Sequence, residues 1–121
     1  IFLMCKVLGM AHVHYVTLLP KSITTAIGMG ISEEAGGIVT LTVMSIILTG
    51  VLGNMVGETV LKVLKICHPV AKGLAMGTSA HAVGTAKALE MGEIEGAMSS
   101  LSIAVAGLMT VVAVPLVANW I

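Results

Sequence analysis

The sequence has few charged and few aromatic residues, and two charged residue types are missing. Arginine and aspartate do not occur, and Phe, Tyr and Trp occur once each. Charged residues make up 10% of the chain, against about 25% in soluble domains, whereas 57% of the residues are hydrophobic. Without a basic surface the chain is not expected to bind nucleic acid. The composition predicts an integral membrane protein.

Cysteine is also scarce, and the two that occur lie far apart. Cys5 and Cys67 belong to no CxxC or Cys-His motif, which argues against a disulfide framework and against a zinc site. No candidate nucleophile is accompanied by a matched base, and the sequence has no phosphate-binding loop motif. We therefore expect a protein that is not an enzyme and that uses neither a metal nor another cofactor.

Two segments are long and apolar enough to cross a membrane without interruption. Residues 38–57 contain no charged side chain, and at about 1.5 Å per residue they cover roughly 30 Å, the thickness of a bilayer core. The second segment, 96–121, ends in Asn119 and Trp120, which are suited to a membrane interface. Both segments are predicted to be transmembrane helices.

Two further stretches, 12–33 and 69–90, have the length of a transmembrane helix but are interrupted by proline, glycine or polar residues. Such interruptions are typical of the discontinuous helices of transporters. The predicted fold is all-α: a polytopic transmembrane helical bundle with two discontinuous helices, broken or re-entrant, in a single domain over residues 1–121. Because the chain starts at Ile1 inside an apolar helical pattern, we expect it to be truncated at its N-terminus.

Charged residues at the ends of these segments predict a topology. Three lysines, Lys62, Lys65 and Lys72, flank one turn, which the positive-inside rule places in the cytoplasm. The glutamates gather at two other connections, Glu33 with Glu34, and Glu90 with Glu93 and Glu95. If both interrupted segments cross fully, the acidic connections fall on the opposite side. If the segments are re-entrant, the acidic connections share the lysine side.

A weak internal repeat pairs the two interrupted segments. Residues 57 positions apart are identical at several places, and four of these identical pairs, with one similar pair, support a repeat. The pairs are Ser22 with Ser79, Glu33 with Glu90, Ile46 with Ile103, Gly50 with Gly107, and the similar pair Thr42 with Ser99. Each unit would be one interrupted segment followed by one intact span, as in transporters whose substrate site lies between repeats. Chance identity in a biased composition is the alternative.

Polar residues gather where the two segments are interrupted. In hydrocarbon a polar side chain is costly unless it is buried in protein or faces a water-filled cavity, so these clusters predict a functional site. Thr78, His81 and Thr85 have the spacing of one helical face and would form a polar stripe. Hydroxyls, a lysine and helix N-termini favour an anion, which predicts a small carboxylate. The candidate substrate-binding residues are Lys21, Ser22, Thr24, Thr25, Thr78, Ser79, His81 and Thr85.

Each of these residues also has a structural interpretation. Lys21 is either the fixed counter-charge of the substrate or a lysine that extends to the membrane interface. His81 either carries a coupled proton or packs between helices with its hydrogen bonds satisfied. Serine and threonine hydroxyls in membrane helices often bond the preceding turn. Gly53 and Gly57, spaced as GxxxG, predict close helix packing.

Two longer patterns resemble a known family. The stretch LPKSITTAIG, together with GLAMGTSAHAVGTAKALEMGEIEGA, is similar to the LrgB/CidB family of bacterial inner-membrane proteins. The resemblance covers about residues 18–115 and implies the C-terminal half of a multi-pass protein of the bacterial inner membrane. Two departures concern the site: Ala26 stands where the family often has proline, and Ser79 precedes Ala80 where the usual order is Ala-Ser-His.

The resemblance implies two kinds of function. Family members are described as effectors of murein hydrolase export that work with a small holin-like partner of the LrgA/CidA type. A plastid relative translocates glycolate and glycerate, and bacterial pairs are associated with pyruvate. We therefore expect a carrier of small monocarboxylates in the lipid bilayer, working by alternating access. The alternatives are a holin-system regulator of murein hydrolase export and autolysis, or a helix-packing scaffold for the LrgA-type partner. Assembly into a homo-oligomer stays open.

Overall fold

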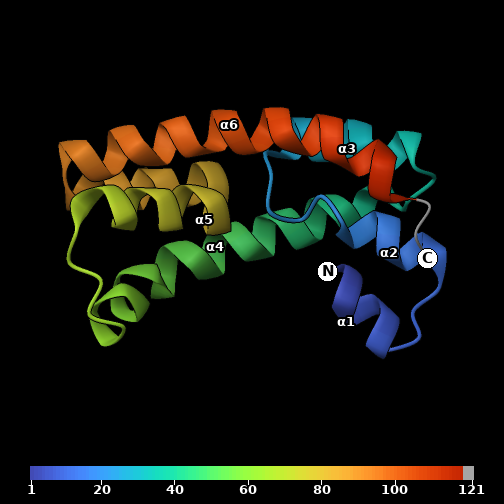
Figure 1. Ribbon diagram of the computed structural model, residues 1–121, viewed down its shortest axis with the longest axis horizontal. Coiled ribbons are helices and arrows are strands. Elements are labelled where there is room, and N and C mark those ends of the chain that lie inside the picture. Colours follow the sequence, from blue (N-terminus) through green and yellow to red (C-terminus); the bar gives the residue numbers. More distant parts are fainter. Residues whose placement is uncertain (119–121) are drawn as a thin grey trace.

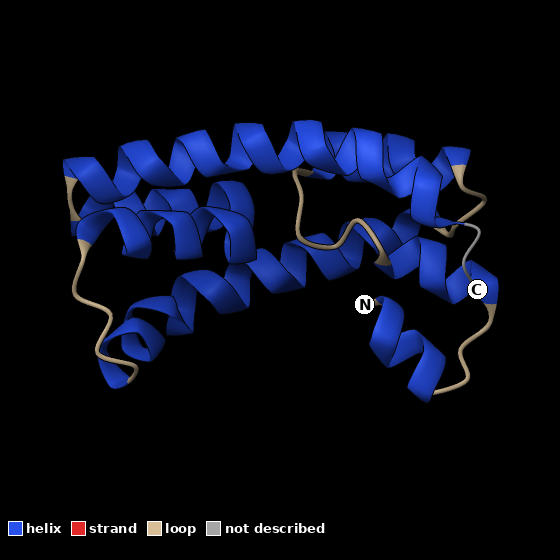
Figure 2. Cartoon of the chain, viewed as in Figure 1, coloured by secondary structure: helices blue, strands red, loops and turns tan. Residues whose placement is uncertain are grey.

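The computed structural model describes residues 1–118, which form six helices joined by short loops (Figures 1 and 2). In chain order these are α1 (Phe2–Val7), α2 (His12–Leu18), α3 (Thr25–Glu34), α4 (Val39–Val63), α5 (Pro69–Met91) and α6 (Glu93–Val117). Within this described part there is no β-strand, which confirms the predicted all-α fold. Asn119 and Trp120, predicted to lie at an interface, fall outside it.

The two long helices α4 and α6 correspond to the predicted spans. Each has 25 residues and is apolar enough to cross a membrane, with mean hydropathies of 1.9 and 2.2. Only 17% of the most apolar window of each helix is buried inside the protein, so most of the apolar side chains face outward, as lipid contact requires. The helices run in opposite directions (Figure 1). Both differ from the predicted bounds, since α4 continues to Val63 and α6 begins at Glu93.

The first interrupted segment folds into a hairpin. After α2 ends at Leu18, the chain turns through Pro20 and α3 begins at Thr25. Backbone hydrogen bonds from Lys21 N to Leu18 O (3.1 Å) and from Ile23 N to Pro20 O (3.3 Å) close this turn. Figure 1 shows α3 returning towards the end of the molecule at which α2 began. Residues 12–34 are called the first hairpin below.

The second interrupted segment also reverses, inside α5. At His81 the backbone leaves the helical conformation, with φ 43° and ψ −135°. The arm 82–91 then runs back beside the arm 69–80 (Figure 1). The arms approach so closely after the turn that a Cβ on Gly84 would lie 2.6 Å from the carbonyl oxygen of Met76. Residues 69–91 are called the second hairpin.

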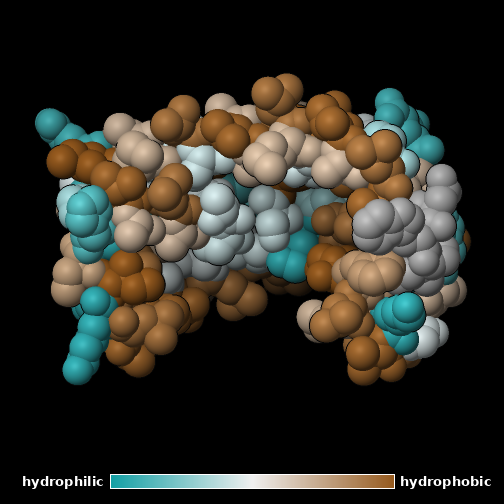
Figure 3. Space-filling model, viewed as in Figure 1, coloured by the Kyte–Doolittle hydropathy of each residue, from teal (hydrophilic) through white to brown (hydrophobic). Residues whose placement is uncertain are grey.

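Because the second hairpin turns back, both of its ends lie at the same end of the molecule. Lys72 on its first arm and Glu90 on its second arm line one pocket, together with Lys62 near the end of α4. The acidic connection around Glu90 therefore shares the lysine side, as expected for a re-entrant segment. The end of α3, with Glu33, lies at the opposite end of α4 (Figure 1). Figure 3 shows hydrophilic side chains at both ends, hydrophobic ones along the upper and lower edges of the view, and residues of intermediate to hydrophilic character across its centre.

Glycines allow the long helices to approach the second hairpin. Gly53 on α4 faces the Cβ of Ala80, and a Cβ on Gly57 would lie 2.6 Å from the sulfur of Met76. These contacts confirm the prediction that the GxxxG pair serves helix packing. They bring α4 directly against the first arm of the hairpin.

Candidate functional site

A cavity of about 360 Å³, called the inner cavity below, lies between α4 and the turns of the two hairpins. Lys21 from the first turn and Ser79 from the second line it, together with Thr49 from α4. The remaining wall consists of small or apolar residues of α4 and α5: Gly53, Val56, Gly57, Val60, Leu61, Ala75 and Met76. The fold thus brings together one candidate residue from each interrupted segment.

Lys21 is the charged group of this cavity. Its ammonium donates a hydrogen bond to the hydroxyl of Ser22 (2.9 Å), and it forms no ion pair with any carboxylate of the described residues. The side chain is half-buried. A half-buried ammonium group that lacks a carboxylate partner favours an anionic ligand.

Thr24 and Thr25 mark the start of α3 at the same turn. Thr24 is the N-cap residue in an extended conformation (φ −62°, ψ 145°), and its hydroxyl makes no capping bond. The first N–H groups of a helix have no partner inside it and give this end a partial positive charge. The two threonines do not line the inner cavity.

His81 does not line the inner cavity, and its side chain contacts α4. Its imidazole is buried, with 4% exposure, and Nε2 lies 2.9 Å from the carbonyl oxygen of Ile46. Because a carbonyl oxygen only accepts, Nε2 must carry the hydrogen and donate it. Gly50 makes room for the ring, since a Cβ there would lie 2.6 Å from His81 Cε1. This geometry matches the packing interpretation of His81.

Asn54 holds the same turn from a second point. Its side-chain amide donates to the carbonyl oxygen of Val83 (2.9 Å), two residues beyond His81. The turn of the second hairpin is therefore bonded to α4 on both sides. Sequence reasoning missed Asn54, although an amide inside an otherwise apolar span was the available signal.

Thr78 and Thr85 lie on different arms, so the predicted polar stripe is wrong. The stripe assumed a continuous helix, whereas the backbone reverses at His81. Thr78 bonds the preceding turn through Leu74 O (2.7 Å), as Ser79 does through Ala75 O (2.6 Å).

Thr85 is buried against α6. Its hydroxyl donates to the carbonyl oxygen of His81 (3.0 Å) and is 2.7 Å from the hydroxyl of Ser99. The second hairpin is therefore bonded to both long helices. Thr85 completes this attachment and has no contact with the inner cavity.

A comparable hydroxyl network, not recognised in the sequence, supports the first hairpin. The hydroxyl of Thr42 on α4 is 2.8 Å from Thr17 O and 2.7 Å from the hydroxyl of Ser32. The hydroxyl of Thr17 accepts a hydrogen bond from the backbone N–H of Ile38 (2.8 Å). These bonds satisfy buried polar groups at the start of α4 and fix α2 and α3 against it.

Two antiparallel apolar helices, with two hairpins whose polar turns meet beside them, define a helical protein suited to a membrane. Residues 1–120 match the LrgB-like family. The chain belongs to this family, as the motifs around Lys21 and His81 indicated.

Curated relatives support the same assignment. The Antiholin-like protein LrgB of Bacillus cereus (strain B4264) and that of Bacillus anthracis (strain A0248) are each 41% identical to this chain over 116 residues. The matched region is 96% of this chain but 50% of each relative, so the chain spans about half the length of the curated relatives it matches. No solved structure matches the chain.

Proposed function

We propose that this chain is part of a membrane protein with an antiholin-like role, which regulates murein hydrolase export together with a small LrgA-type partner. The similarity to relatives named antiholin-like supports this cellular role. Such a name describes a role in the cell and leaves the molecular activity open. The cellular role and the molecular activity are therefore two separate proposals.

For the molecular activity, we infer binding and transport of small monocarboxylates of the pyruvate, glycolate and glycerate class. The observation that carries this proposal is the inner cavity, which Lys21 and Ser79 line together among mostly apolar residues. Lys21 would bind the carboxylate, while Ser79 and Thr49 would bond the oxygen at the second carbon. The mostly apolar wall lowers the polarity around the ion pair, which strengthens it.

The two hairpins would act as discontinuous, re-entrant membrane segments on either side of this cavity. They enter from opposite ends of the molecule, and only α4 and α6 would cross the bacterial inner membrane completely. Irregular backbone at membrane depth is tolerated where it is buried in protein or lines a cavity. Alternating access would then follow from movement of one hairpin relative to the other.

The relation between the two halves would be an inverted repeat. Thr42 and Ser99, which are equivalent in the 57-residue offset, each pair with a hydroxyl on the returning arm of the preceding hairpin. The partners are Ser32 and Thr85, and both oxygen–oxygen distances are 2.7 Å. The opposite directions of α4 and α6 support inversion rather than translation.

A second equivalent pair supports the same relation. Gly50 on α4 faces His81 at the turn of the second hairpin. Its counterpart Gly107 on α6 faces Ile23 and Ile27 at the turn of the first hairpin. Each long helix would thus contact, at a glycine, the turn of the hairpin that belongs to the other repeat.

Uptake into vesicles containing the full-length protein tests the carrier proposal. We expect saturable uptake of labelled pyruvate, glycolate or glycerate, with competition among them. Lys21→Gln should lower uptake at least about tenfold, the scale expected when a charge-assisted hydrogen bond is lost. Lys6→Gln is the matched control, because Lys6 lies on α1 over the Phe2 ring and outside the cavity. Unsaturable leakage of unrelated solutes would exclude a carrier.

The regulatory role has a separate test. Co-purification with the LrgA-type partner and control of autolysis should be measured in wild type and in Lys21→Gln. If both survive the substitution and no solute flux is found, the protein is a regulator or scaffold without a substrate site. Loss of autolysis control together with loss of uptake would link the two activities.

A further inference from the structure

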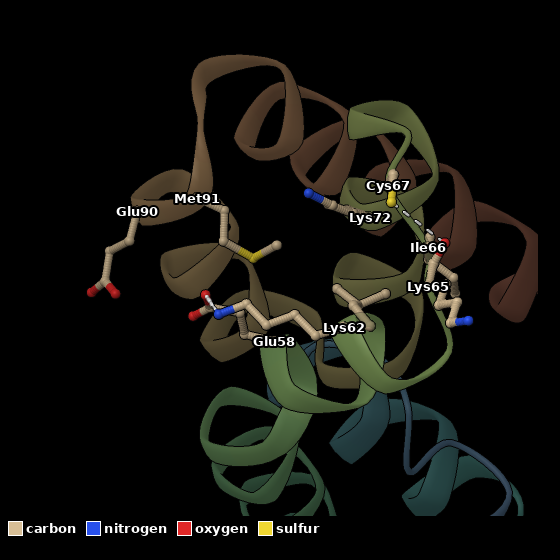
Figure 4. A pocket seen from close by; sticks show the side chains of 9 residues that line it. Glu58, Lys62, Lys65, Ile66, Cys67, Lys72, Glu90 and Met91 are labelled. Carbon is tan, nitrogen blue, oxygen red and sulfur yellow. Dashed lines mark hydrogen bonds and ion pairs between the residues drawn. The ribbon is translucent and has the colours of Figure 1, made fainter.

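A second and larger pocket lies at the lysine end of the molecule, next to the inner cavity, with which it shares Leu61. It has a volume of about 580 Å³ and lies between the end of α4 and the two arms of the second hairpin (Figure 4). Its lining residues are Glu58, Leu61, Lys62, Lys65, Ile66, Cys67, Lys72, Glu90 and Met91. This space is called the outer pocket.

The carboxylates of the outer pocket already have partners. Glu58 pairs with Lys62 (2.7 Å) and with Lys87 (3.3 Å), and Lys87 also pairs with Glu90 (3.0 Å). Within the described part of the chain, Lys65 and Lys72 are in no ion pair. The pocket therefore has two uncompensated positive charges.

Lys72 stands where its local structure does not favour a cation. It lies four residues into α5, close to the helix N-terminus, where the partial charge is also positive. The side chain is half-buried, and Figure 4 shows its ammonium projecting over the pocket. An anion in the pocket would offset both the charge repulsion and the loss of hydration.

Lys65 also occupies an unfavourable position. It has a positive φ of 56° in the turn that follows α4, which Ile66 N closes by bonding Leu61 O (2.9 Å). Glycine is the usual residue at this point of a helix end, because a Cβ is strained there. The exposed Lys65 side chain lies at the rim of the pocket and extends away from it in Figure 4. Its four-carbon stem is long enough for the ammonium group to turn back to the mouth of the pocket. A lysine at this strained position is explained if its positive charge binds an anionic ligand.

Apolar side chains form part of the outer pocket and of the neighbouring end of α4. Val63 and Leu64 at the end of α4 are 74% and 63% exposed, and Ile66 and Met91 form part of the wall. This is the end of a helix long enough to cross the bilayer, and headgroups lie at that level. A ligand with one anionic group and an apolar body would match both parts of the pocket.

We propose that the outer pocket binds the phosphate of an anionic glycerophospholipid. Lys65 and Lys72 hold the phosphate from its two sides, and the first methylene groups lie over Leu64 and Ile66. Basic pockets at helix ends are suited to such headgroups. The two lysines of this site do not line the inner cavity, and the proposal does not depend on carboxylate transport.

Native mass spectrometry of the full-length protein in a neutral detergent tests this site. Phosphatidylglycerol, phosphatidylcholine with the same acyl chains and water-soluble glycerol phosphate are titrated separately. Phosphatidylglycerol should bind most tightly, and Lys65→Gly with Lys72→Gln should weaken it about 25-fold, roughly fivefold for each lysine. Lys65→Gly also relieves the backbone strain, so the variant keeps its fold. Lys6→Gln is the control and should bind as wild type.

Three results would overturn the proposal. The first is that the double variant binds phosphatidylglycerol as tightly as wild type does. The second is that wild type binds phosphatidylcholine as tightly as phosphatidylglycerol. Equal affinity for glycerol phosphate would show that the source of the phosphate is soluble rather than lipid. Lys72→Arg provides a check on folding, since it keeps the charge and should retain binding that Lys72→Gln loses.

Discussion

The two hairpins share a construction but are attached to the long helices in different ways. The turn of the second hairpin is bonded to α4 through His81 and Asn54. The turn of the first hairpin meets α6 through Ile23 and Ile27 at Gly107, an apolar contact. One turn is held by directional hydrogen bonds and the other by packing. Similar polar interruptions in the sequence therefore lead to different attachments.

The same difference separates the two residues with the strongest sequence signal. Lys21 lines the inner cavity with no carboxylate partner among the described residues, whereas His81 is buried and bonded to Ile46. A polar residue at a helix break is thus evidence of a ligand site only when it faces open space. In this protein that condition favours Lys21.

The largest effect on stability is expected from His81→Ala. The substitution removes a buried ring and its hydrogen bond to α4, and it should lower the free energy of unfolding by about 2–3 kcal/mol. Thermal unfolding in detergent measures this loss. His14→Ala, on an exposed face of α2, should leave stability nearly unchanged. Equal stability of His81→Ala and wild type would contradict the claim that hydrogen bonds hold the second turn to α4.

The glycine pair gives the next largest effect. In Gly50→Ala the new Cβ would lie 2.6 Å from the His81 ring, which is fixed by its hydrogen bond, so we expect a loss of about 1–2 kcal/mol. In Gly107→Ala the nearest atom is the terminal Cδ1 of Ile27 at 3.1 Å, which can rotate away. Denaturation of the two variants should therefore give unequal losses, and equal losses would contradict the proposed difference in attachment.

Removal of equivalent hydroxyls is expected to have a smaller effect. Thr42→Val removes bonds to Thr17 O and to Ser32, and should cost about 1 kcal/mol. Ser99→Ala should cost about 0.5 kcal/mol, because Thr85 keeps its bond to the carbonyl oxygen of His81. Chemical denaturation of the two variants checks the order. A larger loss for Ser99→Ala would reverse it.

The smallest effect on stability is expected from Ser22→Ala, within about 0.5 kcal/mol, since the hydroxyl is only half-buried. It should nevertheless weaken carboxylate uptake two- to threefold, roughly 0.5 kcal/mol, because Ser22 orients the Lys21 ammonium. The apparent KM for pyruvate in vesicles measures this change. An unchanged KM would show that Lys21 needs no orienting partner.

The sequence predicted most of the elements and less of their contacts. Apolar length identified α4 and α6, and the interruptions at Pro20 and around His81 located both turns. The sequence left open whether the second segment is broken or re-entrant, because a single residue with positive φ, here His81, does not alter the hydrophobic periodicity of a sequence. For the same reason Thr78 and Thr85 were assigned to one face.

The partners of the candidate residues also escaped prediction. That Lys21 and Ser79 line one cavity depends on how the two hairpins fold back, which spacing along the chain does not encode. Asn54 and Thr42 act on distant segments, and a bond between distant segments has no local pattern. The residue types led to a candidate ligand class, which stays a prediction, whereas the arrangement of the residues could not be predicted.

The unequal attachment of the two turns has a mechanical consequence. Any sliding of the second hairpin along α4 breaks the bonds of His81 and Asn54 together, so these two elements move as one rigid body. The isoleucines of the first turn can slide over Gly107 while keeping their packing, as in a shear between helices. Because the arms of the first hairpin stay bonded to α4 through Thr42, the expected displacement is local and lies at its turn, which carries Lys21.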